Sequence, residues 1–306
     1  MRSLRPLFVA LLFLSSQAGA RRMQETGTFP TPWIHGAKDC HSSEPVFQVH
    51  RYASDTYILR QNKCAHFEAP FLYLLFGKRK ALLLDTGAEV KGQPPRPLHE
   101  LVQDLVASWE RQSGSGPVSL IVAHTHAHGD HRAGDALFTG QPRTTVVEPT
   151  LEGVQRFFGL KRWPEGDATF DLGDRPLTVL PLPGHEPTHI AVYDPRHQLL
   201  FTGDTLYPGL LTVRDWPAYR KSVGRLAAFV ATHKVTHVLG CHIEMTRRPR
   251  EMYPLETTYQ PEEHVLQLGP RHVEELHRAM EVLGDQPSRD VHDDFIIEWI
   301  PPRPAP

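Results

Sequence analysis

The octapeptide HTHAHGDH, His124–His131, directly follows the apolar run VSLIVA, Val118–Ala123. A continuous apolar run of this length is typical of a strand buried in a sheet that is covered on both faces. Residues that follow the carboxyl end of such a strand lie where α/β folds bind their ligands. Four histidines and an aspartate in eight positions therefore indicate a metal-binding loop.

The spacing within the octapeptide predicts two neighbouring metal sites. His126 and His128 are two residues apart, so both can face the same side of a loop that leaves a strand. Asp130 and His131 follow Gly129 and can face a second point nearby. Because four ligands are too few for two sites, the chain must supply more of them elsewhere.

Three later segments repeat the same context, in which a predicted strand is followed by a metal-binding side chain beside a glycine. His185 lies in PLPGHEPTH, Asp204 in FTGDTLY and His242 in LGCHIE. The neighbouring glycines allow the backbone to turn sharply. We expect these three side chains to meet the octapeptide in space.

These motifs occur in the order HxHxDH, PGH, GD and a final His, and LLLDTG with Asp85 precedes them. On this basis the chain, from about Phe47 to Glu244, resembles the metallo-β-lactamase superfamily. The resemblance implies one zinc held by His126, His128 and His185, a second held by Asp130, His131 and His242, and a bridging Asp204. It also implies that Asp85 orients a ligand; capping a turn is the alternative. Many relatives have a second Gly-His after the PGH turn, where this chain has Glu186-Pro187-Thr188-His189.

The implied centre suits hydrolysis. Imidazole and carboxylate ligands fit two Zn²⁺ per chain, although ligand type alone leaves iron and manganese open. Bound zinc lowers the pKa of its water to about 7, so a metal-bound hydroxide can attack an acyl bond. Asp130 is the candidate catalytic residue, because its carboxylate can accept a hydrogen bond from that hydroxide and aim it.

The predicted function is that of an exported dinuclear zinc hydrolase acting on a small-molecule thioester, lactone, ester or β-lactam. One alternative is an oxidoreductase like the mono-iron sulfur dioxygenases of the same fold, which keep two histidines and one aspartate. The other is a non-catalytic metal-binding protein. A strict glyoxalase II would normally carry a basic C-terminal helical domain, for which the last sixty or so residues look short.

Several other residues have open or structural interpretations. His124, His189, His233 and His237 are expected to be structural. Cys241 is expected to be an inert buried residue, with a redox or metal-binding thiol as the alternative. The segment 207–219, YPGLLTVRDWPAY, either lines a pocket or belongs to the core.

The fold class predicted from the order of elements is α/β, an αββα sandwich of two mixed β-sheets lying face to face, with helices on the outer faces and the metal site at one edge. Strands are expected over 46–61 in two pieces, in a hairpin from 71 that turns at 77–79, and at 118–123, 144–147, 177–182, 189–193, 199–202 and 235–239. Helices are expected from 98 to 110, from 130, and at 151–160, 216–232 and 269–283. The tail DDFIIEWI is predicted to add an edge strand.

Residues 1–20 read as a signal peptide, with two arginines, a short apolar run and an Ala-Gly-Ala cleavage site, which predicts a secreted or periplasmic protein. An N-terminal extension is expected over 21–45, the metallo-β-lactamase-like domain over 46–246 and an accessory segment over 247–306. No later run is long enough for stable membrane insertion. A net charge of -2 without a basic block argues against nucleic acid. Pairing of Cys40 with Cys64 and the oligomeric state are left open.

Overall fold

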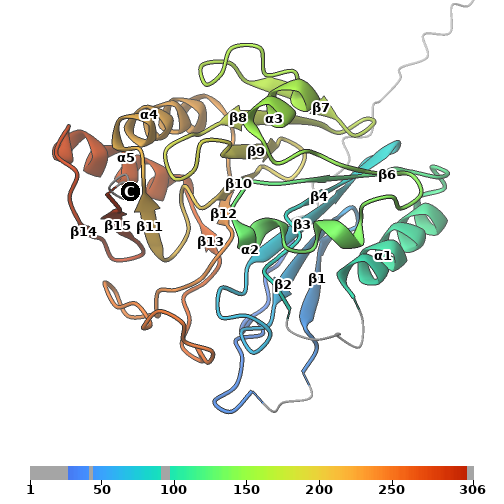
Figure 1. Cartoon of the computed structure of the whole chain (residues 1–306), viewed down its shortest axis with the longest axis horizontal. Helices are drawn as coiled ribbons and strands as arrows, with labels where there is room; N and C mark the ends of the chain where they lie inside the picture. The colour runs from blue at the N-terminus through green and yellow to red at the C-terminus, as the bar shows by residue number, and fades with distance from the viewer. Residues whose placement is uncertain (1–26, 41–43, 91–96, 302–306) are drawn as a thin grey trace, which may run out of the picture.

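The computed structural model of this chain describes residues 27–40, 44–90 and 97–301. Two six-stranded β-sheets pack together with helices on their outer faces, as the order of elements predicted (Figure 1). The expected signal peptide, 1–20, lies outside the described residues.

The first sheet contains six strands in chain order. They are β1 Phe47–Ala53, β2 Thr56–Gln61, β3 Phe71–Phe76, β4 Lys80–Leu84, β5 Ser119–Ala123 and β6 Thr144–Val146. β1 to β4 are antiparallel neighbours, whereas β5 runs parallel to both β4 and β6. Every residue of β3 is buried, which is why FLYLLF is apolar without alternation.

The second sheet has the strand order β13-β12-β10-β9-β8-β7. Its strands are β7 Ala168–Asp171, β8 Pro176–Pro181, β9 Ile190–Asp194, β10 Leu199–Gly203, β12 His237–Gly240 and β13 Gln267–Leu268. Only β10 and β12 are parallel neighbours. β10 and β12 therefore end at the same edge of this sheet, and they place the segments after Gly203 and Gly240 side by side.

Apolar side chains fill the space between the two sheets. The rings of Tyr73 on β3 and Phe201 on β10 have centroids 4.5 Å apart within this core. Towards the other end of the strands, the buried guanidinium of Arg175 donates to the backbone oxygen of Phe76, at 2.9 Å, and to Asp194 Oδ2, at 2.6 Å. Arg175 thus joins the first sheet to the second by hydrogen bonds.

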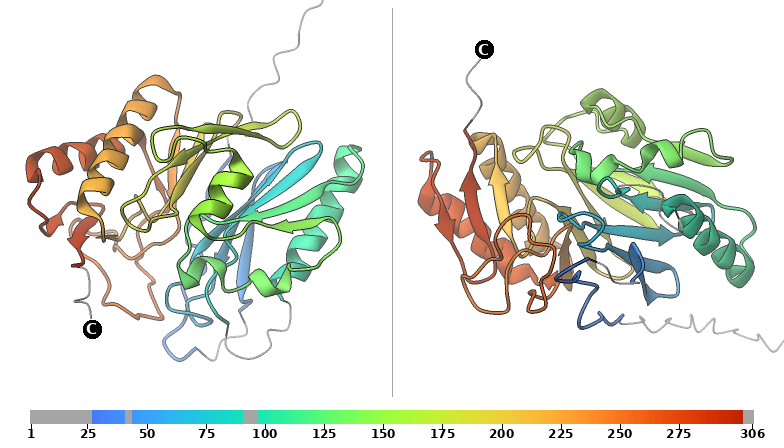
Figure 2. Two further views of the ribbon diagram at one scale, coloured as in Figure 1. Left: turned by 45° about the horizontal axis from the view of Figure 1, so that its top comes forward. Right: turned by 60° about the horizontal axis from the view of Figure 1, so that its bottom comes forward.

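Helices α1 Leu98–Ser113, α4 Trp216–Thr232 and α5 Pro270–Leu283 lie on the outer faces. The other helices of the described residues are α2 Gly129–Arg132, the short 3-10 helix η1 Asp135–Leu137 and α3 Leu151–Phe158. α1 buries Leu98, Val102 and Val106, at helical spacing, against the outer face of the first sheet. α4 and α5 pack together on the second sheet, and Figure 2 shows them on the flank opposite α1.

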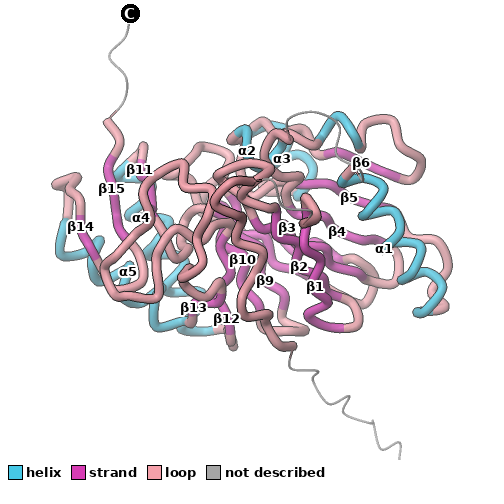
Figure 3. Tube along the Cα trace, turned by 90° about the horizontal axis from the view of Figure 1, so that it is seen from below, coloured by secondary structure: helices cyan, strands magenta, loops and turns pink. Residues whose placement is uncertain are grey.

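A third, three-stranded sheet joins the C-terminal tail to the segment 207–219. It consists of β11 Leu210–Val213, β14 Asp290–Val291 and β15 Ile296–Trp299. The prediction that the tail adds an edge strand was wrong in position, because β15 is the middle strand between β11 and β14 (Figure 3). Ile296 and Ile297 are buried, and Ile297 packs in the core beneath α4 and α5, which explains the central place.

Two further observations concern the cysteines and the helices. Cys40 and Cys64 form a disulfide with their Cα atoms 5.1 Å apart, a pairing that the sequence left open. Cys241 is a free, buried thiol. Within the described ranges, no helix has both the length and the apolar character needed to cross a membrane.

Candidate metal centre

The octapeptide begins where β5 ends and runs into α2. His126 and His131 are buried, and the side chain of Asp130 is only 21% exposed. β5 and α2 therefore anchor the loop at both of its ends. The other predicted ligands come from the second sheet: His185 follows β8, Asp204 follows β10 and His242 follows β12.

Three imidazoles form the first group of potential ligands. His126 Nε2 lies 2.9 Å from His128 Nδ1, and His185 Nε2 lies 3.0 Å from the same atom. His185 Nδ1 is 2.7 Å from the backbone oxygen of Thr212, which can only accept, so the ring proton belongs on Nδ1. Burial lowers the pKa of His185 to about 4 and keeps the ring neutral. Its Nε2 therefore presents a lone pair to the other two histidines, as a metal ligand does.

The second group consists of Asp130, His131, Asp204 and His242. Asp130 Oδ2 is 3.2 Å from His131 Nε2 and 3.4 Å from His242 Nε2. His131 Nδ1 faces Asp85 Oδ2 at 3.0 Å, and His242 Nδ1 faces the backbone oxygen of Glu68 at 3.0 Å. In the neutral form both rings donate outward and turn their Nε2 lone pairs inward.

Asp204 lies between the two groups. Its Oδ2 is 3.6 Å from His185 Nε2 and 3.5 Å from His131 Nε2, while its Oδ1 is 3.4 Å from His242 Nε2. Oδ1 is buried and has no hydrogen-bond partner within the described structure. A buried carboxylate oxygen without a donor is costly unless a cation satisfies it.

The side chains present fit metal ions. In each group the candidate ligand atoms lie within 4.8 Å of one another. Convergent lone pairs of neutral imidazoles and an unsatisfied carboxylate oxygen match a cation better than they match one another, because none of these atoms carries a proton to donate. The structure thus brings together all seven residues that the sequence predicted as ligands.

The two ligand groups differ in their electrostatic surroundings, and the pKa values of their histidines shift in opposite directions. Burial and neighbouring His131 hold the pKa of His126 well below its usual range. For His131, burial acts in the same direction, but Asp130, Asp204 and Asp85 outweigh it and raise the pKa well above its usual range. The carboxylates therefore gather on one side of the centre, and a cation there would replace the proton that they attract.

Asp85 contacts the centre through His131. Its Oδ1 accepts from the backbone N–H of Thr125 at 2.7 Å, and its Oδ2 accepts from the Thr125 hydroxyl at 2.9 Å. The Cys241 thiol also points at Oδ2, with sulfur and oxygen 3.3 Å apart, and burial raises the pKa of this thiol. Asp85 thus lies outside both ligand groups, and Cys241 holds a protonated thiol beside it.

Sequence reasoning missed three partners of the ligands. His189, which we expected to be structural, is buried and accepts from the backbone N–H of Asp204 at 3.1 Å through Nε2. The other two are the backbone oxygens of Glu68 and Thr212. A backbone oxygen has no residue signature, whereas His189 carried the signal of a histidine four residues after His185.

The remaining sequence interpretations can be placed as well. His124 Nε2 bonds Asp135 Oδ1 at 2.8 Å and belongs to neither ligand group. His233 stacks on Phe229 with the ring centroids 3.8 Å apart. The segment 207–219 forms β11 and the first residues of α4. It buries Tyr207, Trp216 and Tyr219 in the core, so its aromatic rings are core residues.

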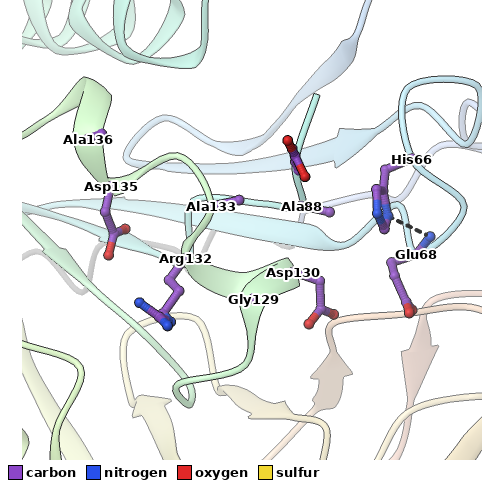
Figure 4. Close-up of a pocket in the computed structure, with 10 residues that line it drawn as sticks. His66, Glu68, Ala88, Gly129, Asp130, Arg132, Ala133, Asp135 and Ala136 are labelled. Atoms are coloured by element: carbon purple, nitrogen blue, oxygen red, sulfur yellow. Dashed lines mark hydrogen bonds between the residues drawn. The ribbon is translucent and has the colours of Figure 1, made fainter. Parts of the chain in front are cut away.

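A cavity of about 750 Å³ opens beside the second group. Asp130 lines it between Arg132 on one side and Glu68 and His66 on the other (Figure 4). Asp135 also contributes a carboxylate to the wall. A small molecule in this cavity would reach the metal centre past the Asp130 carboxylate.

Comparison with known proteins identifies the family of this chain. The family model of the metallo-β-lactamase superfamily matches residues 68–242, more than half of the chain. An acyl-coenzyme A thioesterase, MBLAC2, from Gallus gallus is 29% identical over 61% of this chain and 77% of its own length. MBLAC2 from Homo sapiens is 26% identical over 53% of this chain and 64% of its own length.

Other similar proteins include a second hydrolase and a metallo-β-lactamase. A hydroxyacylglutathione hydrolase from Rhizobium meliloti is 34% identical over 27% of this chain and 32% of its own length. Among solved structures, a metallo-β-lactamase from Erythrobacter litoralis superposes with a TM-score of 0.51 at 18% identity, covering 79% of this chain and 99% of that chain, which bears on the fold alone. By its motifs, its fold and the matching family model, this chain belongs to the metallo-β-lactamase superfamily and is a metal-dependent hydrolase of that fold.

Proposed function

We propose that the protein hydrolyses thioesters with two zinc ions. The observation that carries the proposal is the position of Asp204, whose two oxygens face both ligand groups and whose Oδ1 has no donor. One similar protein is named an acyl-coenzyme A thioesterase and another a hydroxyacylglutathione hydrolase, and these names support thioesters over lactones, esters and β-lactams.

The residues would divide the work as follows. His126, His128 and His185 would hold one zinc, Asp130, His131 and His242 the other, and Asp204 both. Bound zinc supplies an acidified water and polarises the acyl carbonyl. The Asp130 carboxylate borders the cavity, so it can accept a hydrogen bond from the attacking water and aim it at the carbonyl carbon.

The surrounding residues keep these groups in place. Asp85, the Glu68 backbone oxygen and the Thr212 backbone oxygen accept from the outer nitrogens of three histidines and fix their ring orientation. His189 accepts from the backbone N–H of Asp204 and orients the bridging residue. No serine or cysteine nucleophile is required, and the Cys241 thiol is fully buried behind Asp85.

Metal content and turnover test the proposal together. Protein reconstituted with zinc should contain about two zinc ions per chain. It should cleave acyl thioesters faster than the corresponding oxygen esters, and faster than lactones and β-lactams. Asp204→Asn should lower both the zinc content and turnover. One iron per chain with oxygen uptake would instead indicate the oxidoreductase, and a zinc-loaded protein inactive on the whole panel would indicate a binding protein.

We also propose that the protein is exported. The proposal rests on the signal-like pattern at residues 1–20 and is supported by the Cys40–Cys64 disulfide, since disulfides persist in oxidising compartments. N-terminal sequencing of protein recovered from the medium or periplasm should find a start near Arg21. Recovery in the cytosol with an intact N-terminus would contradict export without touching the hydrolase proposal.

A further inference from the structure

A second cavity, of about 450 Å³, adjoins the one at the metal centre. The two cavities share four lining residues, Ala88, Glu89, Ala133 and Ala136. Three of these are alanines, so the common wall is thin. A ligand with one end at Asp130 would pass these three small side chains and the side chain of Glu89 to enter the second cavity.

The two cavities differ in polarity. The first one adds five side chains with charged or titratable groups, namely His66, Glu68, Asp130, Arg132 and Asp135. The second adds apolar side chains from three separate elements: Phe47 begins β1, Leu98 begins α1 and Leu137 ends η1. Leu137 is 38% exposed, so its side chain is available to a ligand.

We propose that the second cavity, the acyl cavity, binds the hydrocarbon chain of the substrate's acyl group while the acyl carbonyl lies at the metal centre. This inference rests on the proposed thioester hydrolysis and adds its substrate class, thioesters of medium-length aliphatic acids. Apolar walls gain free energy from a hydrocarbon chain in proportion to the area that leaves water.

The thiol carrier does not fit the acyl cavity. Its apolar lining offers few partners to the polar groups of a thiol such as glutathione or coenzyme A, which would be buried without hydrogen bonds. The Glu89 carboxylate, which lines both cavities, would also repel an anionic carrier from the acyl cavity. The carrier must therefore extend away from the acyl cavity, and Ala136 and Leu137 become the residues that determine acyl-chain length.

A series of thioesters of one neutral thiol, N-acetylcysteamine, tests this with the zinc-loaded protein. From acetyl to octanoyl, kcat/KM should rise by up to about fourfold for each methylene that enters the cavity. Ala136→Trp fills the shared wall and Leu137→Ser makes the lining polar, so each should lower the octanoyl-to-acetyl ratio of kcat/KM by at least about tenfold. Leu255→Ser, at an exposed leucine that lines neither cavity, is the matched control and should leave the ratio unchanged.

Binding of a non-hydrolysable octyl thioether of the same thiol, measured by calorimetry, separates this inference from the proposed function. If thioethers with longer alkyl chains bind more tightly, and Ala136→Trp weakens their binding, the acyl cavity is supported. Absence of turnover of any thioester in the same protein would overturn only the proposal of thioester hydrolysis. Equal kcat/KM for acetyl and octanoyl thioesters, or an unchanged ratio in both cavity variants, would overturn the acyl cavity and leave the hydrolase intact.

Discussion

Asp85 has a carboxylate that faces several donors at once and touches the centre only through His131. Oδ2 receives the His131 Nδ1 proton at 3.0 Å and the Thr125 hydroxyl proton at 2.9 Å. In Asp85→Asn the amide NH₂ would face these donors or the backbone N–H of Thr125. His131 would then favour the tautomer that protonates Nε2, the atom that faces the second ligand group. We expect zinc affinity to fall roughly 10- to 100-fold, measured by competition with a chromophoric chelator.

His124 supplies the control for this substitution. It lies in the same octapeptide, but its Nε2 bonds Asp135 and not the ligand groups. His124→Ala should cost about 1–3 kcal/mol of unfolding free energy, because it leaves the partly buried Asp135 with fewer partners, while both zinc ions remain. Loss of zinc in His124→Ala would show that the octapeptide has been assigned the wrong register.

All seven candidate ligands could be predicted from the sequence, because histidine and aspartate are metal-binding residue types that can be recognised in the sequence itself. The partners that orient them were harder to find. Glu68 and Thr212 act through backbone oxygens, and every residue has one. Only the fold shows which of them lies opposite a ligand nitrogen.

At the scale of elements, the turns after the strands decide where the ligands point. Gly203 ends β10 with φ at 50°, and a Cβ there would lie 2.7 Å from Thr125 Cβ and 2.8 Å from His189 Nε2. Gly203→Ala should therefore displace His189 and, with it, Asp204. We expect a drop in zinc content, measured by mass spectrometry of the eluted metal, in addition to lower stability.

Gly114 offers the matched comparison, since it ends α1 with φ at 65° and has nothing within 4 Å of an added Cβ. Gly114→Ala should cost only the left-handed strain of about 1–2 kcal/mol and should keep its zinc. Equal zinc content in the two variants would contradict the role given to Gly203.

The major strands and helices could be predicted from periodicity, and so could the short β6 and α2, but β7, β11, β13 and β14 could not. β7 and β13 have four and two residues, and they are strands because β8 and β12 pair with them. β11 was hidden in an aromatic segment whose pairing partner, β15, lies more than eighty residues later. Short strands depend on a neighbour that no local window contains.

At the scale of the molecule, one buried cluster at the end of the sandwich away from the metal centre ties acid stability to Asp55. Burial raises the pKa of Asp55, but His197, Arg175 and Arg196 outweigh it and hold the pKa well below its usual range. Because the folded pKa lies below the unfolded value near 3.9, this stabilisation is complete above about pH 4 and is lost as the pH falls through the folded pKa.

Asp55→Asn should cost about 1–3 kcal/mol at pH 7, because the amide replaces a carboxylate that faces Arg196 and His197 at 2.6 Å, while Arg175 keeps its ion pair with Asp194. The difference from wild type, followed by urea unfolding, should shrink as the pH falls below about 4. The exposed Asp174→Asn should leave stability nearly unchanged. A constant difference at all pH values would contradict the charge argument.

Removal of metal acts on the whole molecule because its ligands come from both sheets. A ligand that binds only the folded state adds about 2.7 kcal/mol when present at a hundred times its Kd. A chelator should therefore lower Tm and abolish turnover together, and added zinc should restore both in calorimetry and in the assay. Turnover that survives the chelator would contradict metal-dependent chemistry.

The interleaving of the ligands has a further consequence. The loop after β5 supplies two members of each ligand group, and the second sheet completes both. Neither half of the chain contains one whole coordination set. Recombination that exchanged either half for a diverged copy would therefore keep both complete ligand sets only if it also preserved the docking of the two halves.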